Sequence, residues 1–151
     1  MTQKTWTVYL SGEIHSDWRD VIAEGVSAAE LPVRLTAPVT DHSESDNCGV
    51  SILGEENKPY WKDRKGAGVN AIRTRTLIRD ADVVVVRFGP KYKQWNAAFD
   101  AGFAAALGKP IITLHEEETD HALKEVDAAA CATARQAREV VEVLKYVIKQ
   151  V

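Results

Sequence analysis

The sequence predicts a flavodoxin-like, Rossmann-type three-layer α/β/α sandwich with a five-stranded parallel sheet in the order 2-1-3-4-5. Val83 to Val86 form an unbroken run of β-branched apolar residues, which is typical of a strand covered on both faces. An alanine-rich helical pattern extends from Asn96 to Leu107, and Gly108 ends it as a C-cap residue. A second apolar run, Ile111 to Leu114, completes a β-α-β unit, whose crossover is expected to be right-handed.

The beginning of the chain supplies two further strands. Trp6 to Leu10 predict the first strand, and a loop of small and polar residues follows it. A helix is expected from Trp18 to about Ala28, capped by Ser16 or Asp17. Val33 to Ala37 predict a short second strand. Strand, small-residue loop and helix are the usual opening of a doubly wound domain.

Residues 38–65 are polar and have no regular pattern, so they predict a partly ordered flap over the ligand-binding edge. The aromatic residues of Pro59-Tyr60-Trp61 indicate that this segment folds back onto the body of the protein. The spacing of its metal-ligating residue types matches neither a zinc motif nor a calcium-binding loop, so no metal site is expected from Asp41, His42, Glu44, Asp46 and Cys48.

Three helices and one strand are expected in the rest of the chain. Gly68 to Asp80 predict a helix with an apolar side and a basic side, whose arginines either face solvent or bind phosphate. A short helix is expected around His121 to Glu125, and a fifth strand at Ala128 to Ala132. The last helix is expected from Ala134 to Lys149, with Thr133 as its cap.

Composition and charge exclude several classes of protein. The 151 residues have the length of a single domain, and the net charge of −3 gives no reason to expect a nucleic-acid or anionic-membrane partner. Cys48 and Cys131 lack CxxC spacing, which favours a reducing, cytoplasmic setting over a zinc finger or disulfide scaffold. We find neither a signal-peptide core nor an apolar run long enough for a membrane span, and we expect no cofactor.

Asp100 is the charged residue that stands out in the central β-α-β unit. It lies in the first turns of a helix whose neighbouring residues are small or apolar. In an open α/β sheet, the loop and helix start that follow a strand lie at the ligand-binding edge. The carboxylate is therefore a candidate nucleophile or general base, or else a solvated residue favoured by the helix dipole.

Arg87 and the pair Ser11-Gly12 are further candidates at the same edge. Arg87 ends a strand that should be buried, so it either holds a phosphate or carboxylate of a ligand or forms an ion pair with a neighbouring carboxylate, for example Asp100 or Glu13. Ser11-Gly12 either lets an anion such as phosphate approach the backbone closely or forms an ordinary tight turn.

Two segments carry a resemblance to known enzymes. FDAGFAAALGKPIITLH, at residues 99–115, resembles the ExGxAxAxGKPV segment of the nucleoside 2-deoxyribosyltransferases. VYLSGEI, at residues 8–14, resembles the YLAGP segment with which those proteins begin, and the order and separation of the two segments also fit. Nearly the whole chain, including KYKQWNAAFDAGFAAALGKP at residues 91–110, resembles the small YtoQ family, which has the same type of fold.

The resemblance implies that Asp100 takes the position of the transferases' catalytic glutamate and that the Tyr9 hydroxyl orients it. Aspartate is shorter by one methylene group, so its carboxylate is drawn back from the substrate. The transferases' Asp-x-Gly-Thr is absent: Gln94 replaces the acid that assists the base, and Trp95 would stack on a nucleobase or plug the pocket. Asn96 would hold a sugar hydroxyl. The expected substrate-binding residues are Ser11, Gly12, Glu13, His15, Arg87, Gln94, Trp95 and Asn96.

These features predict a protein that acts on the N-glycosidic bond of a nucleoside or nucleoside 5′-monophosphate, by hydrolysis or base transfer, through a covalent glycosyl-enzyme. The departures from the family pattern favour one alternative, a non-catalytic nucleotide-binding module. Another alternative is unrelated chemistry with His15, His42 or His115 as the base. The resemblance also implies a homodimer or larger homo-oligomer, with Phe99 and Phe103 as candidate interface residues.

Overall fold

The computed structural model describes residues 3–149. Its sheet has five parallel strands in the order β2-β1-β3-β4-β5, which confirms the predicted fold class. The register aligns the carboxyl ends of the central strands, because Gly12 lies opposite Arg87 and Arg87 lies opposite Leu114. The strands are β1 (Trp6–Gly12), β2 (Val33–Thr36), β3 (Val83–Arg87), β4 (Ile111–Leu114) and β5 (Ala132–Ala134).

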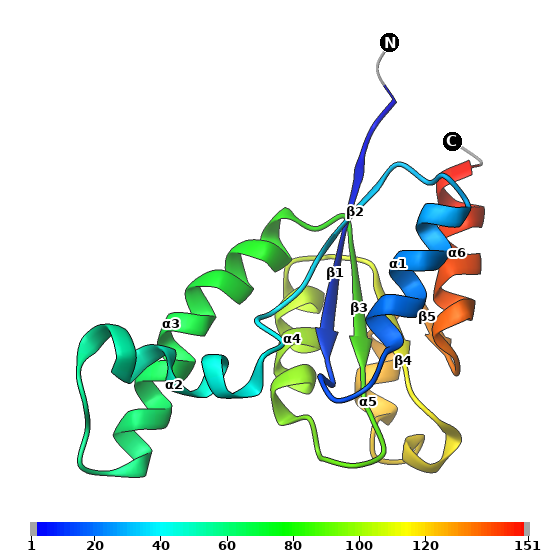
Figure 1. The fold of residues 1–151 in the computed structure, drawn as a ribbon. Helices are drawn as coiled ribbons and strands as arrows, with labels where there is room; N and C mark the ends of the chain where they lie inside the picture. The colour runs from blue at the N-terminus through cyan, green and yellow to red at the C-terminus, as the bar shows by residue number, and fades with distance from the viewer. Residues whose placement is uncertain (1–2, 150–151) are drawn as a thin grey trace.

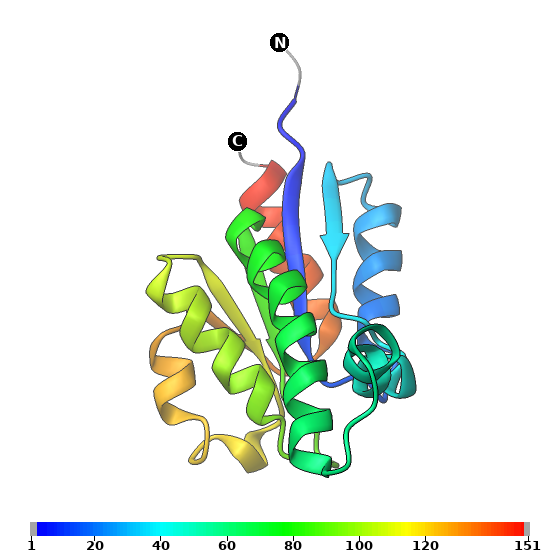
Figure 2. The same cartoon turned by 90° about the vertical axis from the view of Figure 1, so that its left-hand side faces the viewer.

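Helices cover both faces of the sheet (Figures 1 and 2). On one face α1 packs against α6, and on the other α4 contacts both α3 and α5. The helices are α1 (Trp18–Ala28), α2 (His42–Leu53), α3 (Pro59–Asp80), α4 (Trp95–Ala106), α5 (Lys124–Ala128) and α6 (Ala137–Lys149), with a short 3-10 helix at Glu117–Thr119. Within residues 3–149, no helix has the length and apolar character needed to cross a membrane.

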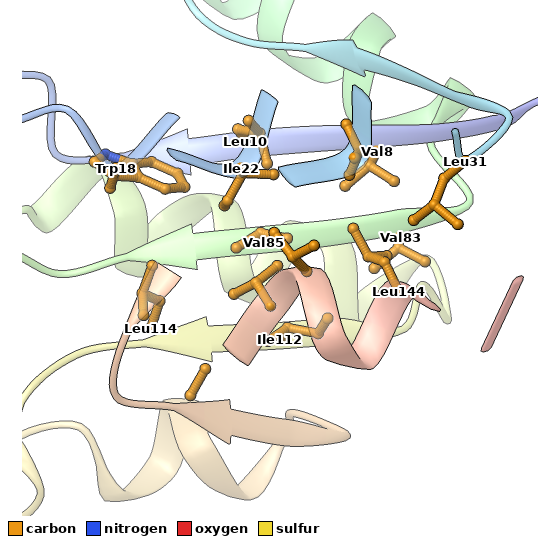
Figure 3. Packing of buried hydrophobic residues seen from close by; sticks show 14 of the residues in the cluster. Val8, Leu10, Trp18, Ile22, Leu31, Val83, Val85, Ile112, Leu114 and Leu144 are labelled. Atoms are coloured by element: carbon orange, nitrogen blue, oxygen red, sulfur yellow. The ribbon is translucent and has the colours of Figure 1, made fainter. Parts of the chain in front are cut away.

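The central strand β3 explains why an apolar run without alternation predicts a parallel strand. Val83 and Val85 pack into a cluster with α1 and α6, whereas Val84 and Val86 pack into a second cluster with α3 and α4. Figure 3 shows the first cluster, in which Val83 and Val85 lie close to Leu144. Because both faces are covered by helices, all four valine side chains of this strand meet apolar surroundings.

The prediction that residues 38–65 form an irregular, partly ordered flap is wrong about their secondary structure. Most of this segment is helical: α2 begins at His42, and α3 begins at Pro59 rather than at Gly68. Asp41 caps α2, since its carboxylate accepts a hydrogen bond of 2.8 Å from the Glu44 backbone N–H. Pro59 occupies the first turn of α3, where the missing N–H is tolerated. The hydrophobic pattern is weak because Gly49 and Val50 are the only buried residues of α2, and none of residues 59–65 of α3 is buried.

Helices α2 and α3 form a hairpin that projects away from the sheet on the side of α4 (Figure 1). Gly49 is buried at their contact, and a Cβ atom there would lie 2.4 Å from the Gly66 nitrogen and 2.4 Å from the Lys65 carbonyl carbon. Lys65 closes the hairpin, because its ammonium group lies 2.6 Å from Glu56 and 2.9 Å from the Gly54 carbonyl oxygen. The close approach of the two backbones therefore requires glycine at position 49.

Gly49→Ala is expected to destabilise the hairpin by about 1–3 kcal/mol, because the added methyl group meets backbone atoms that must shift. This outweighs the helix propensity of alanine, which favours the variant by about 1 kcal/mol. Gly68→Ala is the matched control in α3, since a Cβ atom there meets nothing within 4 Å. Urea unfolding should show a lower midpoint for Gly49→Ala and a slightly higher one for the control. Equal midpoints for the two variants would contradict this account of the hairpin.

In the last part of the chain, the observed helix and strand boundaries differ from the expected ones. The fifth strand is Ala132–Ala134 rather than Ala128 to Ala132, because Thr133 pairs with Thr113 of β4. The short helix is Lys124–Ala128, not His121 to Glu125. Helix α6 begins at Ala137 instead of Ala134, since the Glu139 carboxylate accepts hydrogen bonds from the backbone N–H groups of residues 135 and 136.

Candidate functional site

The candidate site lies at the carboxyl ends of β1 and β3, in the middle of the sheet. With the strand order β2-β1-β3-β4-β5, the chain reverses its direction of winding between these two strands. Ligands of open α/β proteins bind in the crevice at that position, because the loops on either side lead away from each other. Here the two loops are linked by a 3.1 Å hydrogen bond from the Glu13 N–H to the Arg87 carbonyl oxygen.

Asp100 is held at this position by α4. Ala97, Ala101 and Ala104 face the sheet, so the helix approaches closely and carries Asp100 over the end of β1. The Ser11 hydroxyl donates a hydrogen bond of 2.6 Å to Oδ2 of Asp100. Burial raises the pKa of Asp100, while the Ser11 hydrogen bond acts in the opposite direction by favouring the carboxylate. Asp100 is therefore a partly desolvated carboxylate with one oxygen fixed by β1.

Tyr9 is fully buried in the adjoining part of β1, and its hydroxyl has no hydrogen-bond partner among residues 3–149. Burial, followed by the negative charge of Asp100, raises the pKa of Tyr9 to about 12. The Thr74 side chain and two nearby arginines oppose this shift. The phenol is consequently a neutral hydrogen-bond donor at neutral pH, near the carboxylate that the resemblance says it orients.

A first cavity, of about 440 Å³, lies beside Asp100. Its wall combines Phe99 and Phe103 with residues that carry amide and hydroxyl groups, so it offers both an apolar surface and hydrogen-bonding groups. The lining residues come from α4, α3 and the segment around α2: Pro38, Val39, Ser45, Ala67, Asn70, Ala71, Arg73, Thr74, Arg75, Asn96, Phe99, Asp100 and Phe103.

A second cavity, of about 540 Å³, adjoins the first one. The two share four lining residues, so they form two lobes of one site between the α2–α3 hairpin and the sheet: Pro38, Val39, Ser45 and Asn96. The rings of His15 and Tyr92 lie 4.9 Å apart in this second lobe, and those of His15 and His42 lie 6.1 Å apart. Its other lining residues are Gly12, Glu13, Ile14, Asp46, Lys93 and Gln94.

Glu13 shapes the loop that follows β1. Its buried carboxylate accepts hydrogen bonds from the His15 backbone N–H and, at 2.6 Å, from the Ser16 hydroxyl. These donors are therefore used within the protein and are not directed at a bound anion. The Arg19 guanidinium holds the same loop from behind, with hydrogen bonds of 2.7 Å to the Glu13 carbonyl oxygen and 2.9 Å to that of Leu10.

Arg87 does not line either lobe. Its guanidinium forms a two-point ion pair with Glu116, at 2.8 and 3.2 Å, and this contact lowers the pKa of the Glu116 carboxyl. The ion-pair interpretation is therefore correct in kind, but the partner is neither Asp100 nor Glu13. The expectation that Arg87 holds substrate is not met, because its guanidinium is already paired with Glu116, which directly follows the neighbouring strand β4.

Of the three predicted site residues that shortly precede Asp100, Asn96 and Gln94 line the cavity and Trp95 does not. Asn96 lines both lobes, one helical turn before Asp100, as the spacing predicts. Gln94 lines the second lobe and accepts a 3.0 Å hydrogen bond from the Gly89 N–H. Trp95 is 75% exposed and does not line the lobes, so its position fits neither alternative, stacking on a nucleobase in the pocket or plugging it. As the first residue of α4, it lies on the side that faces away from the sheet.

His115 is buried outside both lobes. Its Nε2 atom lies 2.9 Å from Asp127, and its Nδ1 atom lies 2.9 Å from the Glu116 carbonyl oxygen. His115, Asp120 and Asp127 could bring ligand atoms within 4.8 Å of one another, as a metal site requires. However, Asp120 pairs with Arg135 at 2.5 Å, and Asp127 also accepts from Thr113 at 2.8 Å. We therefore assign these groups to the stability of the β4–α5 region.

Several site residues escaped the sequence analysis. They lie on α2 and α3, which are far from β1 and α4 in the sequence: Ser45, Asp46, Asn70 and Thr74. The Asp41-His42-Ser43-Glu44 pattern is a helix-start signal that could have predicted α2. No local pattern indicates that this helix then turns its residues towards Asp100.

Comparison with known proteins agrees with this architecture. The family described as "Nucleoside 2-deoxyribosyltransferase YtoQ" matches residues 9–148. A protein of Bacillus subtilis (strain 168), described as "Uncharacterized protein YtoQ", is 41% identical over 142 residues, which cover 94% of this chain and 96% of the relative.

Two solved structures share the fold. A conserved protein from Enterococcus faecalis V583 superposes with a TM-score of 0.64 at 12% identity, covering 95% of this chain and 99% of that one. A 2-deoxyribosyltransferase from Bacillus psychrosaccharolyticus superposes with a TM-score of 0.53 at 15% identity, covering 89% and 90% of the two chains. The family match and the 41% identity together confirm the predicted resemblance: this chain belongs to the nucleoside 2-deoxyribosyltransferase YtoQ family.

Proposed function

We propose that this protein cleaves the N-glycosidic bond of a nucleoside or nucleoside 5′-monophosphate, with Asp100 as the nucleophile. One observation carries the proposal: the desolvated Asp100 carboxylate lines a cavity while the Ser11 hydroxyl holds one of its oxygens at 2.6 Å. The family description, and the 2-deoxyribosyltransferase among the structural neighbours, support the same substrate class.

The geometry suits the attack of a carboxylate on an anomeric carbon. Because Ser11 binds Oδ2, the other carboxylate oxygen can approach C1′ of the sugar as the bond to the base breaks. Partial desolvation strengthens the interaction of the carboxylate with the oxocarbenium-like transition state. Phe99 and Phe103 offer an apolar wall on the first-lobe side of the carboxylate, and Asn96, which lines both lobes, offers an amide to a sugar hydroxyl. Water or a second base then releases the sugar from Asp100.

Chromatography of released base tests this proposal. We would incubate the protein with deoxyribonucleosides, ribonucleosides and their 5′-monophosphates, with and without an acceptor base. Asp100→Ala is the critical variant. Asp80→Ala is its matched control, because Asp80 is exposed at the end of α3. Base release by the wild type and by the control, but not by Asp100→Ala, would support the proposal, and the acceptor arm would separate hydrolysis from transfer.

Absence of base release from every substrate would overturn the enzyme assignment. The protein would then be a nucleotide-binding module if the same nucleotides raised its melting temperature, since a ligand that binds only the folded state stabilises it. Under that outcome Asp100→Ala should change the affinity for the nucleotide, and neither the wild type nor the variant should form a product.

We also expect the protein to form a homodimer or a larger closed assembly. Trp95 and Phe99 lie four residues apart on α4 and are 75% and 63% exposed, which is unusual for aromatic side chains in a monomer. Light scattering at micromolar concentration should give at least twice the mass of one chain, and Trp95→Glu should lower it. Tyr146→Glu, at a 73% exposed residue of α6, is the control. A monomeric wild type would contradict this expectation.

A further inference from the structure

N-glycosidic cleavage requires a group that protonates the departing nucleobase, and the position expected to supply it holds Gln94. An amide does not donate a proton to a leaving group at neutral pH. The Gln94 side chain is also engaged, because its oxygen accepts the 3.0 Å hydrogen bond from the Gly89 N–H. Another residue that lines the site must therefore supply the proton.

We propose that His42, oriented by Asp46, is the proton donor to the leaving nucleobase, an inference that rests on the proposed function. His42 is the first residue of α2, and Asp46 follows it by one helical turn. The Nε2 atom of His42 lies 3.2 Å from Oδ2 of Asp46. This contact is an ion pair when the imidazole is protonated, with Nε2 on the Asp46 side and Nδ1 left to exchange a proton with a ligand.

The position of this pair suits the role. His42 and Asp46 both line the second lobe, whereas Asp100 lines the first. Asn96, which precedes Asp100 by one turn of α4, lines both lobes and marks where they meet. The nucleophile on α4 and the imidazole on α2 thus belong to opposite walls of one cleft. A sugar bound at Asp100 can direct its base towards His42.

The other titratable groups that line the second lobe are less suited to donate a proton. The Glu13 carboxylate is buried and takes hydrogen bonds from the loop that it shapes. His15 packs against the Tyr92 ring at 4.9 Å, and within residues 3–149 its ring forms no ion pair with a carboxylate of the kind that His42 forms with Asp46. Lys93 lies over the Trp95 ring, 5.6 Å from its centroid, and so is directed towards the exposed side of α4.

The proposed reaction balances in two steps. In the first, an Asp100 oxygen forms an ester bond to C1′ while the C1′–N bond breaks. The bonding pair stays on the base, which takes the proton from Nδ1 of His42. In the second, His42 is the neutral imidazole and accepts a proton from water as the water oxygen bonds to C1′. The free sugar and the Asp100 carboxylate result, and His42 regains its proton.

The dependence on the leaving group tests this role. Guanine needs a proton to depart from guanosine, whereas the 7-methylguanine of 7-methylguanosine is already cationic and leaves without one. We would measure base release from both nucleosides and from their 2′-deoxy forms with the wild type, His42→Gln and Asp46→Asn. His121→Gln is the matched control, because His121 is exposed and does not line either lobe.

We expect His42→Gln to lower release of guanine by about 10²-fold to 10⁴-fold, the usual range for a general acid. Release of 7-methylguanine should change by less than about threefold, because no proton is needed there. Asp46→Asn should show the same selectivity with a smaller loss, as expected of a positioning residue. The control should match the wild type on both nucleosides.

Three outcomes would overturn the inference. Equal losses on the two nucleosides would show that His42 is only structural. An active His42→Gln variant, with base release still abolished in Asp100→Ala, would leave the proposed function intact and remove His42 from it. A wild type that releases neither base would overturn the proposed function together with this inference.

Discussion

Asp100→Asn is expected to lower the rate of base release by about 10³-fold or more, because an amide cannot form the glycosyl ester. The Ser11 hydroxyl can still donate to the amide oxygen, so the local hydrogen bond survives the substitution. Single-turnover measurement of released base would check this, with Asp80→Asn as the control on an exposed carboxylate. A variant that retained more than a tenth of the wild-type rate would exclude Asp100 as the nucleophile.

The same substitution is expected to stabilise the protein at neutral pH. Burial raises the pKa of Asp100 in the folded state, so folding disfavours its ionised form. The unfolded state then binds fewer protons than the folded state between the ordinary carboxyl pKa and the raised one, and wild-type stability falls as the pH rises through that window. The loss remains at higher pH and is absent at a pH below both values.

Thermal unfolding from pH 3 to pH 8 would show this opposition between activity and stability. At pH 7, Asp100→Asn should unfold at a higher temperature than the wild type, by the equivalent of about 1 kcal/mol. The difference should shrink at pH 3, where Asp100 is protonated in both states. If the variant were less stable than the wild type at every pH, the Asp100 carboxylate would stabilise the folded state, and burial of its charge would not be a cost to folding.

Gly12→Ala is expected to destabilise the fold by about 3 kcal/mol or more, a large part of the stability of an ordinary domain. Gly12 has a φ of +109°, which L-residues rarely adopt. A Cβ atom would also lie 2.1 Å from the Arg87 carbonyl oxygen, in the middle of the sheet. The variant should show a much lower urea midpoint and should lose the geometry that directs Ser11 to Asp100.

Gly102→Ala is the matched control for Gly12→Ala. Gly102 lies within α4, and a Cβ atom there meets nothing within 4 Å. Alanine should therefore stabilise that helix by about 0.5–1 kcal/mol. Unchanged unfolding of Gly12→Ala would mean that neighbouring strands can move apart at this position. Glycine would then not be required at position 12 for the stability of the fold.

Much of the fold follows from local sequence patterns. The run Val83 to Val86 has apolar residues in both phases of the strand, and the structure buries them in two clusters on opposite faces. The helix that carries Asp100 is indicated by its alanine repeat and by Gly108, which has a φ of +71° after α4. The predicted position of the fifth strand is wrong because the extended conformation of its three residues depends on pairing with β4.

The candidate site is only partly determined in this way. Local sequence rules indicate Asp100 and Ser11 as candidates, because each stands at a strand end or helix start whose direction such rules fix, and the resemblance adds Asn96. The sequence could not choose the partner of Arg87, since the choice depends on which carboxylate the neighbouring strand brings within reach. The structure assigns that partner to Glu116.

The sequence by itself determined the α/β layers, the parallel strands and the position of Asp100 at the carboxyl ends of the central strands. Local periodicity specifies which faces of an element are apolar, and the direction of chain winding then limits the topology. Tertiary structure alone decided how the helices of the polar segment 38–65 pack and that they bring His42 and Ser45 to the Asp100 cleft. Its helices form by packing on each other at Gly49, and such a contact between distant backbones leaves little trace in local hydrophobic pattern.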